Sequence, residues 1–374
     1  MDPMKRYLQE IIEKDLQKKM VFLGGPRQVG KTTLSKEILK ICNGSYLNWD
    51  YDQDRSLILE NELNWKDLMI LDEIHKYKRW RNWIKGIYDK KNKDTQILIT
   101  GSAQLDLYRH GGDSLQGRYH YHRLHPLSVK ELKINSQKDF NTLMQLGGFP
   151  EPFFSSSQVE SKRWSREYRT RLVREDIYSL ENIKDLDLLE KLIIRLPALV
   201  GSPLSINSLR EDLQIAHKTV AKWIIVLEKM FNLFRLPPLG GAQIRAVKKE
   251  QKHYHYDWTL IKENGPKFEN LLACHLLKWV HHQEDTYGED VELRYFRDSD
   301  GREVDFIILK DNEVKHMIEA KYSKSEISHH LSYLKKKYPS AQATQVFYNG
   351  VQSDTVNQNG IRQAPAYMFL NDWI

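Results

Sequence analysis

The distribution of hydrophobic residues predicts alternating helices and strands in the first part of the chain. Residues 4–18 carry apolar side chains at helical spacing, and 20–23 form a short apolar run typical of a buried strand. The elements expected to follow are a helix at 31–41 and strands at 46–49, 68–71 and 96–100. Strands that alternate with helices predict an α/β domain in which a parallel sheet is covered on both faces.

From 160 to 199 the pattern is that of helices only. Ser205 is a suitable cap for a short helix at 206–213, and a longer helix with one apolar face follows it. The next segment has prolines at 237–238 and glycines at 240–241 between β-prone runs. Two helices followed by a hairpin predict a helix-turn-helix with a wing, which is a winged-helix domain.

A third region begins near residue 265 with a helical stripe of apolar residues. The elements expected after it are strands at 291–296, 303–309, 315–322 and 344–348, and a helix at 326–338. This mixture predicts a small α/β domain. We therefore expect three domains, over residues 1–150, 151–260 and 261–374.

The composition is that of a globular protein, because 40% of the 374 residues are hydrophobic and 29% are charged. The length exceeds what one hydrophobic core usually supports, which agrees with several domains. The net charge of +7 is uneven, with +6 in the first predicted domain, +4 in the second and −3 in the third. Attraction of nucleic acid is therefore expected from the first two domains.

Only two cysteines occur, Cys42 and Cys274, so we expect neither a disulfide framework nor a thiolate metal site. The first 19 residues mix acidic and basic side chains and lack the apolar run of a signal peptide. No stretch approaches the roughly 20 apolar residues of a membrane span. These features predict a cytoplasmic protein that does not bind membranes.

The predicted strand at 20–23 runs into the pattern G-x-x-x-x-G-K-T, which opens the next helix. In this pattern the glycines let backbone N–H groups converge on phosphates, the lysine reaches the β- and γ-phosphates, and the hydroxyl binds Mg²⁺. Strand, motif and helix in register argue against a chance match. We predict a site for ATP and Mg²⁺ formed by Gly25, Pro26, Arg27, Gln28, Val29, Gly30, Lys31, Thr32 and Thr33, with Thr32 as a metal ligand.

A second part of such a site follows the apolar run at 68–71. Asp72 is placed to hold Mg²⁺ through its water shell, and Glu73 to polarise the attacking water. The alternative is a surface acidic pair that caps the next helix. The extra strand at 46–49, between the P-loop strand and the Asp72 strand, favours the P-loop ATPases with an inserted strand over kinases and GTPases.

Two further residues are candidates for contact with the γ-phosphate. Ser102, in Thr100-Gly101-Ser102, occupies a sensor position, although a plain turn also explains these small residues. Arg118 is a candidate cation for the transition-state charge, in its own or a neighbouring subunit. A solvated surface arginine is an equal alternative.

Near the C-terminus, Asp305 lies on one predicted strand, and Glu319 and Lys321 lie at alternate positions on the next. This is the arrangement of metal-dependent nucleases, with Asp305, Glu319 and Glu269 as Mg²⁺ ligands and Lys321 stabilising the hydroxide. We expect the three strand residues to face a solvated cleft. Against cleavage, this domain is net acidic, and Val304 stands where the motif has proline. The alternative is a docking module in which the charges bond with one another.

Basic residues of the middle domain are candidates for contact with DNA. Those that lie off the apolar face of the longer helix are His217, Lys218, Lys222 and Lys229. Winged helices in ATPases also serve as packing modules, which is the alternative. Upstream, the arginines are Arg163, Arg166, Arg169, Arg171 and Arg174. They form either a solvated face or a phosphate track, whereas Trp164 and Tyr168 share a face that we expect in the core.

Several motifs occur in an order that resembles a known family. Besides the P-loop with Thr33, these are Leu71-Asp72-Glu73-Ile74-His75, Thr100-Gly101-Ser102, Leu115-Gln116-Gly117-Arg118, Gly147-Gly148-Phe149-Pro150-Glu151, Phe268-Glu269-Asn270, Val304-Asp305-Phe306 and Ile318-Glu319-Ala320-Lys321. Together they resemble the prokaryotic AAA-like ATPases that carry a C-terminal domain with a restriction-endonuclease-like core. The resemblance spans nearly the whole chain and implies an AAA-type core, a helical and winged-helix middle, and a PD-(D/E)xK-type end.

Two hypotheses follow. In the first, the chain is an ATPase whose nucleotide state controls a winged-helix domain and a nuclease-like domain that act on DNA. In the second, turnover is slow, ATP serves as a conformational latch, and the C-terminal domain binds a protein partner. Stimulation of ATP hydrolysis by DNA would favour the first.

Overall fold

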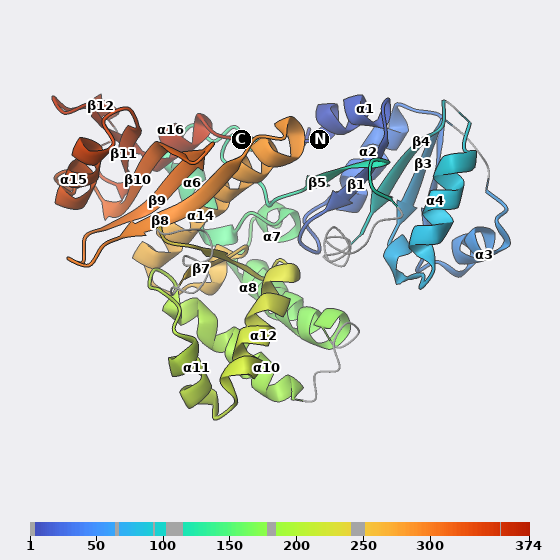
Figure 1. Cartoon of the computed structure of the whole chain (residues 1–374), viewed down its shortest axis with the longest axis horizontal. Coiled ribbons are helices and arrows are strands. Elements are labelled where there is room, and N and C mark those ends of the chain that lie inside the picture. The colour runs from blue at the N-terminus through green and yellow to red at the C-terminus, as the bar shows by residue number, and fades with distance from the viewer. Residues whose placement is uncertain are drawn as a thin grey trace. The chain divides into compact units, whose positions relative to one another are not determined.

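The computed structural model describes residues 4–63, 67–92, 94–101, 115–177, 185–240, 251–351 and 353–374. The chain divides into two compact units, residues 1–126 and 127–374 (Figure 1). The second unit contains all of the predicted middle and C-terminal domains and also residues 127–150 of the predicted first domain. The three-domain boundaries at 150 and 260 stay a prediction.

The first unit contains a five-stranded parallel sheet in the order β2-β3-β4-β1-β5. Its strands are β1 (Met20–Gly24), β2 (Gly44–Asn48), β3 (Leu68–Asp72), β4 (Gln96–Thr100) and β5 (Tyr119–Arg123). Four of them confirm predicted strands, and β5 was not predicted because its Tyr-His alternation gives no apolar run. The strand predicted between the P-loop strand and the Asp72 strand, at 46–49, corresponds to β2, which lies at the sheet edge instead. The strand between β1 and β3 is β4.

Helices cover both faces of this sheet. The helices are α1 (Gln9–Leu16), α2 (Lys31–Lys40), α3 (Asp52–Glu60) and α4 (Trp80–Lys90), with a short 3₁₀ turn at Ile74–Lys76. Helix α2 packs on β2, β3 and β4, and α1 packs on β1 and β4. The opposite face carries α4, whose Ile84 and Ile87 join Met69 and Ile97 of the sheet in one apolar cluster. Strands β1 and β3 are buried along their whole length, as a parallel sheet between two helix layers requires.

The second unit begins with helices. They are α6 (Gln137–Leu146), α7 (Pro150–Phe154), α8 (Gln158–Arg171), a π-helical turn (Leu172–Ile177), α10 (Leu186–Arg195) and a 3₁₀ turn (Leu196–Leu199). Those from α8 onward agree with the helical pattern predicted for 160–199, whereas α6 and α7 were not predicted. Ser157 caps α8 by accepting a hydrogen bond from the Glu160 backbone. Trp164 and Tyr168 are buried and stack with ring centroids 4.9 Å apart, which confirms their place in the core.

The predicted helix-turn-helix corresponds to α11 (Ile206–Leu213) and α12 (His217–Lys229). Ser205 caps α11 through the Ser208 backbone N–H, as expected. Two antiparallel strands follow, β6 (Leu233–Leu236) and β7 (Lys252–His255). Residues 241–250, including Gly241 of the predicted wing, lie outside the described residues. The winged-helix assignment therefore stays a prediction.

The rest of the second unit is built on a mixed six-stranded sheet in the order β12-β13-β11-β10-β9-β8. The strands are β8 (Val291–Arg297), β9 (Glu303–Lys310), β10 (Glu313–Ser323), β11 (Gln342–Asn349), β12 (Thr355–Val356) and β13 (Ile361–Pro365). The helices are α14 (Asn264–His282), α15 (His329–Lys337) and α16 (Ala366–Asn371), with short turns at Trp258–Leu260 and Gln283–Tyr287. Helix α14 packs on β8 and β10, and α15 packs on β9, β10 and β11 (Figure 1). The buried side chains of α15 are Leu331 and Leu334. Strands β12 and β13 were not predicted.

Candidate functional site

The predicted phosphate loop connects β1 to α2, as its sequence requires. Gly25 has a φ of 130°, and a Cβ atom there would lie 2.3 Å from the Leu124 carbonyl oxygen, so only glycine fits. Gly30 precedes α2 with a φ of 99°. The loop therefore delivers the N-terminus of a ten-residue helix to the carboxyl end of β1, where its free N–H groups favour an anion.

Lys31 folds back over this loop. Its Nζ atom donates to the carbonyl oxygens of Gly25 at 3.0 Å and Pro26 at 2.6 Å, and the residue is buried. The ammonium group is therefore held where the loop can enclose a phosphate. The loop backbone is braced by Arg6, which is buried and donates to the Val29 carbonyl oxygen at 2.8 Å.

Asp72, the last residue of β3, accepts hydrogen bonds from three hydroxyl groups. Thr32 Oγ1 and the Tyr46 hydroxyl both donate to Oδ2, at 2.8 and 2.6 Å, and Thr100 donates to Oδ1. Burial, and then the bond to Asp72, raises the pKa of Tyr46 well above its ordinary value, so the phenol remains a donor. The hydroxyls fix a buried carboxylate beside the loop.

Glu73 follows in a left-handed conformation with a φ of 57°. Its N–H donates to the Thr100 carbonyl oxygen at 3.0 Å, which ties it to the end of β4. Burial raises the pKa of Glu73, whereas Lys76, with Nζ 3.4 Å from Oε2, lowers it. His75 Nε2 lies 3.5 Å from the same oxygen, but burial lowers the pKa of His75 to about 3, so the imidazole is neutral at physiological pH.

These residues are suited to bind Mg²⁺ together with a nucleoside triphosphate. A threonine hydroxyl and an aspartate carboxylate, already 2.8 Å apart, are hard oxygen donors of the kind Mg²⁺ prefers. Lys31 and the partly buried Glu73 lie at the same edge of the sheet. Thr33 has an exposed side chain in the first turn of α2, and its contact with the nucleotide stays a prediction.

Arg118 does not join this group within the chain. It precedes β5, and the parallel register pairs Tyr119 with Met20 and Arg123 with Gly24. Its backbone is therefore about 16 Å along the strands from the start of the loop. The Arg118 Nε atom donates to Asp89 Oδ1 at 3.0 Å. Ser102, the predicted sensor, lies outside the described residues.

The C-terminal carboxylates surround a lysine that the sequence did not single out. Lys252, on β7, is fully buried, and its Nζ atom lies 2.6 Å from Glu303, 3.1 Å from Glu269 and 3.2 Å from Asp305. The Tyr254 hydroxyl also donates to Glu269, at 2.7 Å. Burial, followed by repulsion from Asp305, raises the pKa of Glu269.

This arrangement does not fit the predicted metal site. The ammonium group of Lys252 lies against Glu269 and Asp305, where it would oppose a metal cation, and Glu319 pairs with Lys321 at 2.8 Å. The other oxygen of Glu319, Oε2, is buried and has no hydrogen-bond partner among the described residues. Within the described part of the chain, no three or more Asp, Glu, His or Cys side chains are grouped to hold a metal ion. The expectation of a solvated cleft was also wrong for Glu319, which is only 5% exposed.

Lysine and histidine side chains lie on the exposed face of α12. His217, Lys218, Lys222 and Lys229 are all exposed, and the apolar face opposite is buried. Exposure alone does not distinguish a DNA contact from a solvated face. DNA as a partner therefore stays a prediction.

Comparison with known protein families agrees with the fold of the first unit. Residues 17–133 match the model of an AAA domain, and 137–263 and 264–369 match two domains of unknown function, DUF8612 and DUF4143. With the five-stranded parallel sheet and its loop, the first unit is an AAA-like P-loop domain. Among the described residues, no helix is long and apolar enough to cross a membrane.

Two relatives with similar sequences are both named as uncharacterized proteins. The chain is 23% identical to an uncharacterized protein of Haemophilus influenzae, over 99% of this chain and 98% of that one. It is 26% identical to an uncharacterized protein of Methanocaldococcus jannaschii, over 67% and 63% of the two chains. The Thermotoga maritima RuvB Holliday junction branch migration motor has a TM-score of 0.29 at 21% identity, covering 62% of this chain and 87% of that one. Such a score carries no argument about function.

Proposed function

We propose that the first unit binds Mg²⁺-ATP and hydrolyses it. The observation that carries this proposal is the bond of Thr32 to Asp72, which puts two hard oxygen donors beside Lys31 at the end of β3 and the start of α2. A threonine hydroxyl beside an aspartate carboxylate at this place in the fold is the arrangement that a metal-nucleotide site requires.

Each residue then has a definite task. The loop N–H groups and Lys31 bind the phosphates, and Thr32 and Asp72 hold the metal, which supplies charge neutralisation when bound. Glu73 accepts the proton of the attacking water, with its carboxylate held near the end of β4 by the backbone bond to Thr100.

For the second unit, we propose a binding function that responds to the nucleotide state, rather than metal-dependent cleavage. The support is Lys252, whose ammonium group lies 3.1 Å from Glu269 and 3.2 Å from Asp305, so that it would oppose a metal cation at carboxylates that a nuclease would use. The hypothesis of a docking unit is therefore favoured over the nuclease hypothesis, and the partner is either DNA or a protein.

The test is ATP binding by calorimetry and ATP hydrolysis with Mg²⁺, with and without DNA. Lys31→Ala should abolish tight ATP binding, and Glu73→Gln should bind ATP but not turn it over. Lys40→Ala, at an exposed lysine of the same helix that pairs with Glu37, is the matched control. Undiminished ATP affinity in Lys31→Ala would remove the assignment of the nucleotide site.

A further inference from the structure

A second site in the molecule has the character of an anion-binding pocket. It lies in the second unit beside α8 and encloses about 330 Å³. Four basic side chains line it, and no acidic side chain is among its described lining residues. The four, which we call the basic pocket residues, are Lys162, Arg166, Arg169 and Lys267.

Three of these cations form a row on one helix. Positions 162, 166 and 169 follow the four- and three-residue spacing of a helix face, so the side chains point the same way. The row spans about 10 Å at 1.5 Å per residue. Lys267 comes from the first turn of α14, where the helix dipole disfavours a cation. Its position is therefore one that a bound anion would stabilise.

The basic pocket residues differ from Arg163 and Arg171 of α8 because they form no ion pair with a carboxylate of the described residues. Arg163 pairs with Glu160 at 3.1 Å, and Arg171 pairs with Glu167 at 3.4 Å. In the described part of the chain, none of the four pocket cations makes an ion pair or a side-chain hydrogen bond. Glutamates of α8 thus neutralise Arg163 and Arg171, whereas the cations that line the pocket have no ion-pair partner among the described residues.

The carboxylate of Asp257, which acts on Lys267, is already engaged by two hydroxyl groups. Asp257 is buried and accepts hydrogen bonds from the hydroxyls of Ser165 at 2.7 Å and Thr259 at 2.6 Å. Burial lowers the pKa of Lys267, Asp257 partly offsets this, and the like charge of Lys162 lowers it again. The cluster of positive charge is therefore only partly compensated by the protein itself.

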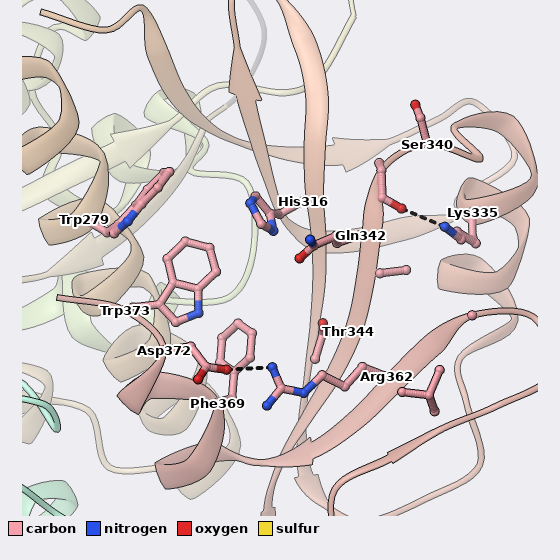
Figure 2. Close-up of a pocket in the computed structure, with 14 residues that line it drawn as sticks. Trp279, His316, Lys335, Ser340, Gln342, Thr344, Arg362, Phe369, Asp372 and Trp373 are labelled. Atoms are coloured by element: carbon pink, nitrogen blue, oxygen red, sulfur yellow. Dashed lines mark hydrogen bonds and ion pairs between the residues drawn. The ribbon is translucent and has the colours of Figure 1, made fainter. Parts of the chain in front are cut away.

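Another pocket of the same unit shows what compensated cations look like. In the pocket of Figure 2, Arg362 is paired with both Asp354 and Asp372, at 2.7 Å each. Lys335 donates to the carbonyl oxygens of Pro339 and Ala341. The basic side chains of that pocket bond to carboxylates and carbonyl oxygens of the protein. Among the described residues, the basic pocket residues make no such side-chain bonds.

We propose that the basic pocket binds a ligand with two linked phosphate groups. A row of about 10 Å is longer than one phosphate needs, and guanidinium groups bind phosphate oxygens through paired hydrogen bonds. The linked phosphates belong either to a free diphosphate or to consecutive positions of a nucleic-acid strand. This inference does not depend on ATP hydrolysis, because the site and the P-loop lie in different units.

The test uses the full chain carrying Lys31→Ala, which removes phosphate binding at the P-loop. Pyrophosphate binding is measured by calorimetry, and binding of single-stranded oligothymidylate by fluorescence anisotropy over a range of salt. Lys162→Gln with Arg166→Gln removes two exposed pocket cations, and Lys267→Gln removes the half-buried one. Arg163→Gln with Arg171→Gln removes the same charge from the paired arginines.

We expect the pocket variants to weaken binding of at least one probe by about tenfold or more, and the control to leave it nearly unchanged. For the oligonucleotide, each lost contact should reduce the salt slope by about 0.7. Loss with pyrophosphate alone identifies a free diphosphate as the source, and loss with the oligonucleotide identifies a strand. Binding of neither probe, or equal weakening in the control, would overturn the proposal. Thermal unfolding of each variant shows that the fold is retained.

Discussion

The Tyr46 hydroxyl donates a 2.6 Å hydrogen bond to Asp72, on the same carboxylate oxygen that Thr32 contacts. Tyr46 lies on the edge strand β2, away from the loop, so this bond reaches Asp72 from the far side of β3. It would keep Asp72 in one orientation if Thr32 and Asp72 hold a metal as proposed. We therefore assign Tyr46 as a positioning residue of the nucleotide site.

Tyr46→Phe should leave ATP affinity nearly unchanged and lower the rate of hydrolysis about tenfold, because a hydrogen bond to a charged group contributes about 1.5–3 kcal/mol. It should also raise the Mg²⁺ concentration needed for half-maximal rate. Tyr51→Phe, at an exposed tyrosine of the same unit, is the control. A rate and Mg²⁺ dependence like the wild type would show that the bond is only structural.

Glu73 leads to a prediction about pH. Its raised pKa means that the base is lost by protonation at a pH above the ordinary glutamate value of 4.5, so the acid limb of the rate profile should lie above that value. Lys76 lowers this pKa, and Lys76→Met should therefore shift the acid limb to higher pH. Lys78→Met makes the same charge change at an exposed neighbour. An identical shift in both variants would show that only the general charge matters.

The nucleotide loop could be predicted from the sequence because its chemistry is local. Gly25 to Thr32 are contiguous, and Asp72 and Glu73 end an apolar strand, so the motif and its flanks identify both segments. The bond of Tyr46 to Asp72 could not, because it joins residues 26 apart and depends on the pairing of β2 with β3. The order of the strands was not predictable either, since position in the chain does not fix position in a sheet.

The carboxylate cluster shows the same limit in the second unit. Asp305, Glu319 and Lys321 were correctly placed on adjacent strands, because alternation within a strand is visible in the sequence. Lys252 lies 53 residues before Asp305 and follows a segment of ambiguous pattern. Its burial changes the chemistry of the cluster, and only the tertiary contact reveals it.

Lys252→Met should destabilise the second unit by about 3–5 kcal/mol, since it leaves buried carboxylates without their cation. The raised pKa of Glu269 would rise further, so the cost should be largest at alkaline pH and shrink as falling pH protonates that group. Urea unfolding at several pH values measures both effects. Lys262→Met, at an exposed lysine, is the control.

Binding of Mn²⁺ tests whether the carboxylate cluster holds a metal ion. Protein in which Lys31→Ala is the only substitution should bind no Mn²⁺ at the carboxylate cluster, as followed by electron paramagnetic resonance. Mn²⁺ binding that disappears in Asp305→Asn and Glu319→Gln would contradict the role given to Lys252 and restore the nuclease hypothesis.

If α12 contacts duplex DNA, Lys218→Glu with Lys222→Glu should weaken binding and reduce the salt slope by about 2, because each phosphate contact contributes a slope of about −0.9. Gel shifts at several salt concentrations measure this. Lys336→Glu with Lys337→Glu changes the net charge equally on the exposed end of α15. Unchanged binding in the α12 variant would exclude a DNA contact of that helix.

Arg118 raises the question of a neighbouring subunit, because its own loop lies at the other end of the parallel strands. Its bond to Asp89, in the last turn of α4, holds the guanidinium at that end. If Arg118 neutralises transition-state charge, it does so in a partner's site. Arg118→Ala should then lower hydrolysis by about 10³-fold or more while ATP affinity remains.

Mixing two inactive variants distinguishes the two arrangements. Arg118→Ala retains Glu73, and Glu73→Gln retains Arg118, so a site between the two subunits is complete when each supplies what the other lacks. Hydrolysis should therefore reappear on mixing, at a fraction of the wild-type rate that depends on protein concentration. Asp89→Asn, which removes the ion pair but keeps Arg118 and Glu73, should hydrolyse ATP by itself, without mixing with a second variant. If the mixture stays as inactive as its components while both variants bind ATP and associate, Arg118 has no role in a neighbouring site, and the solvated-arginine alternative holds.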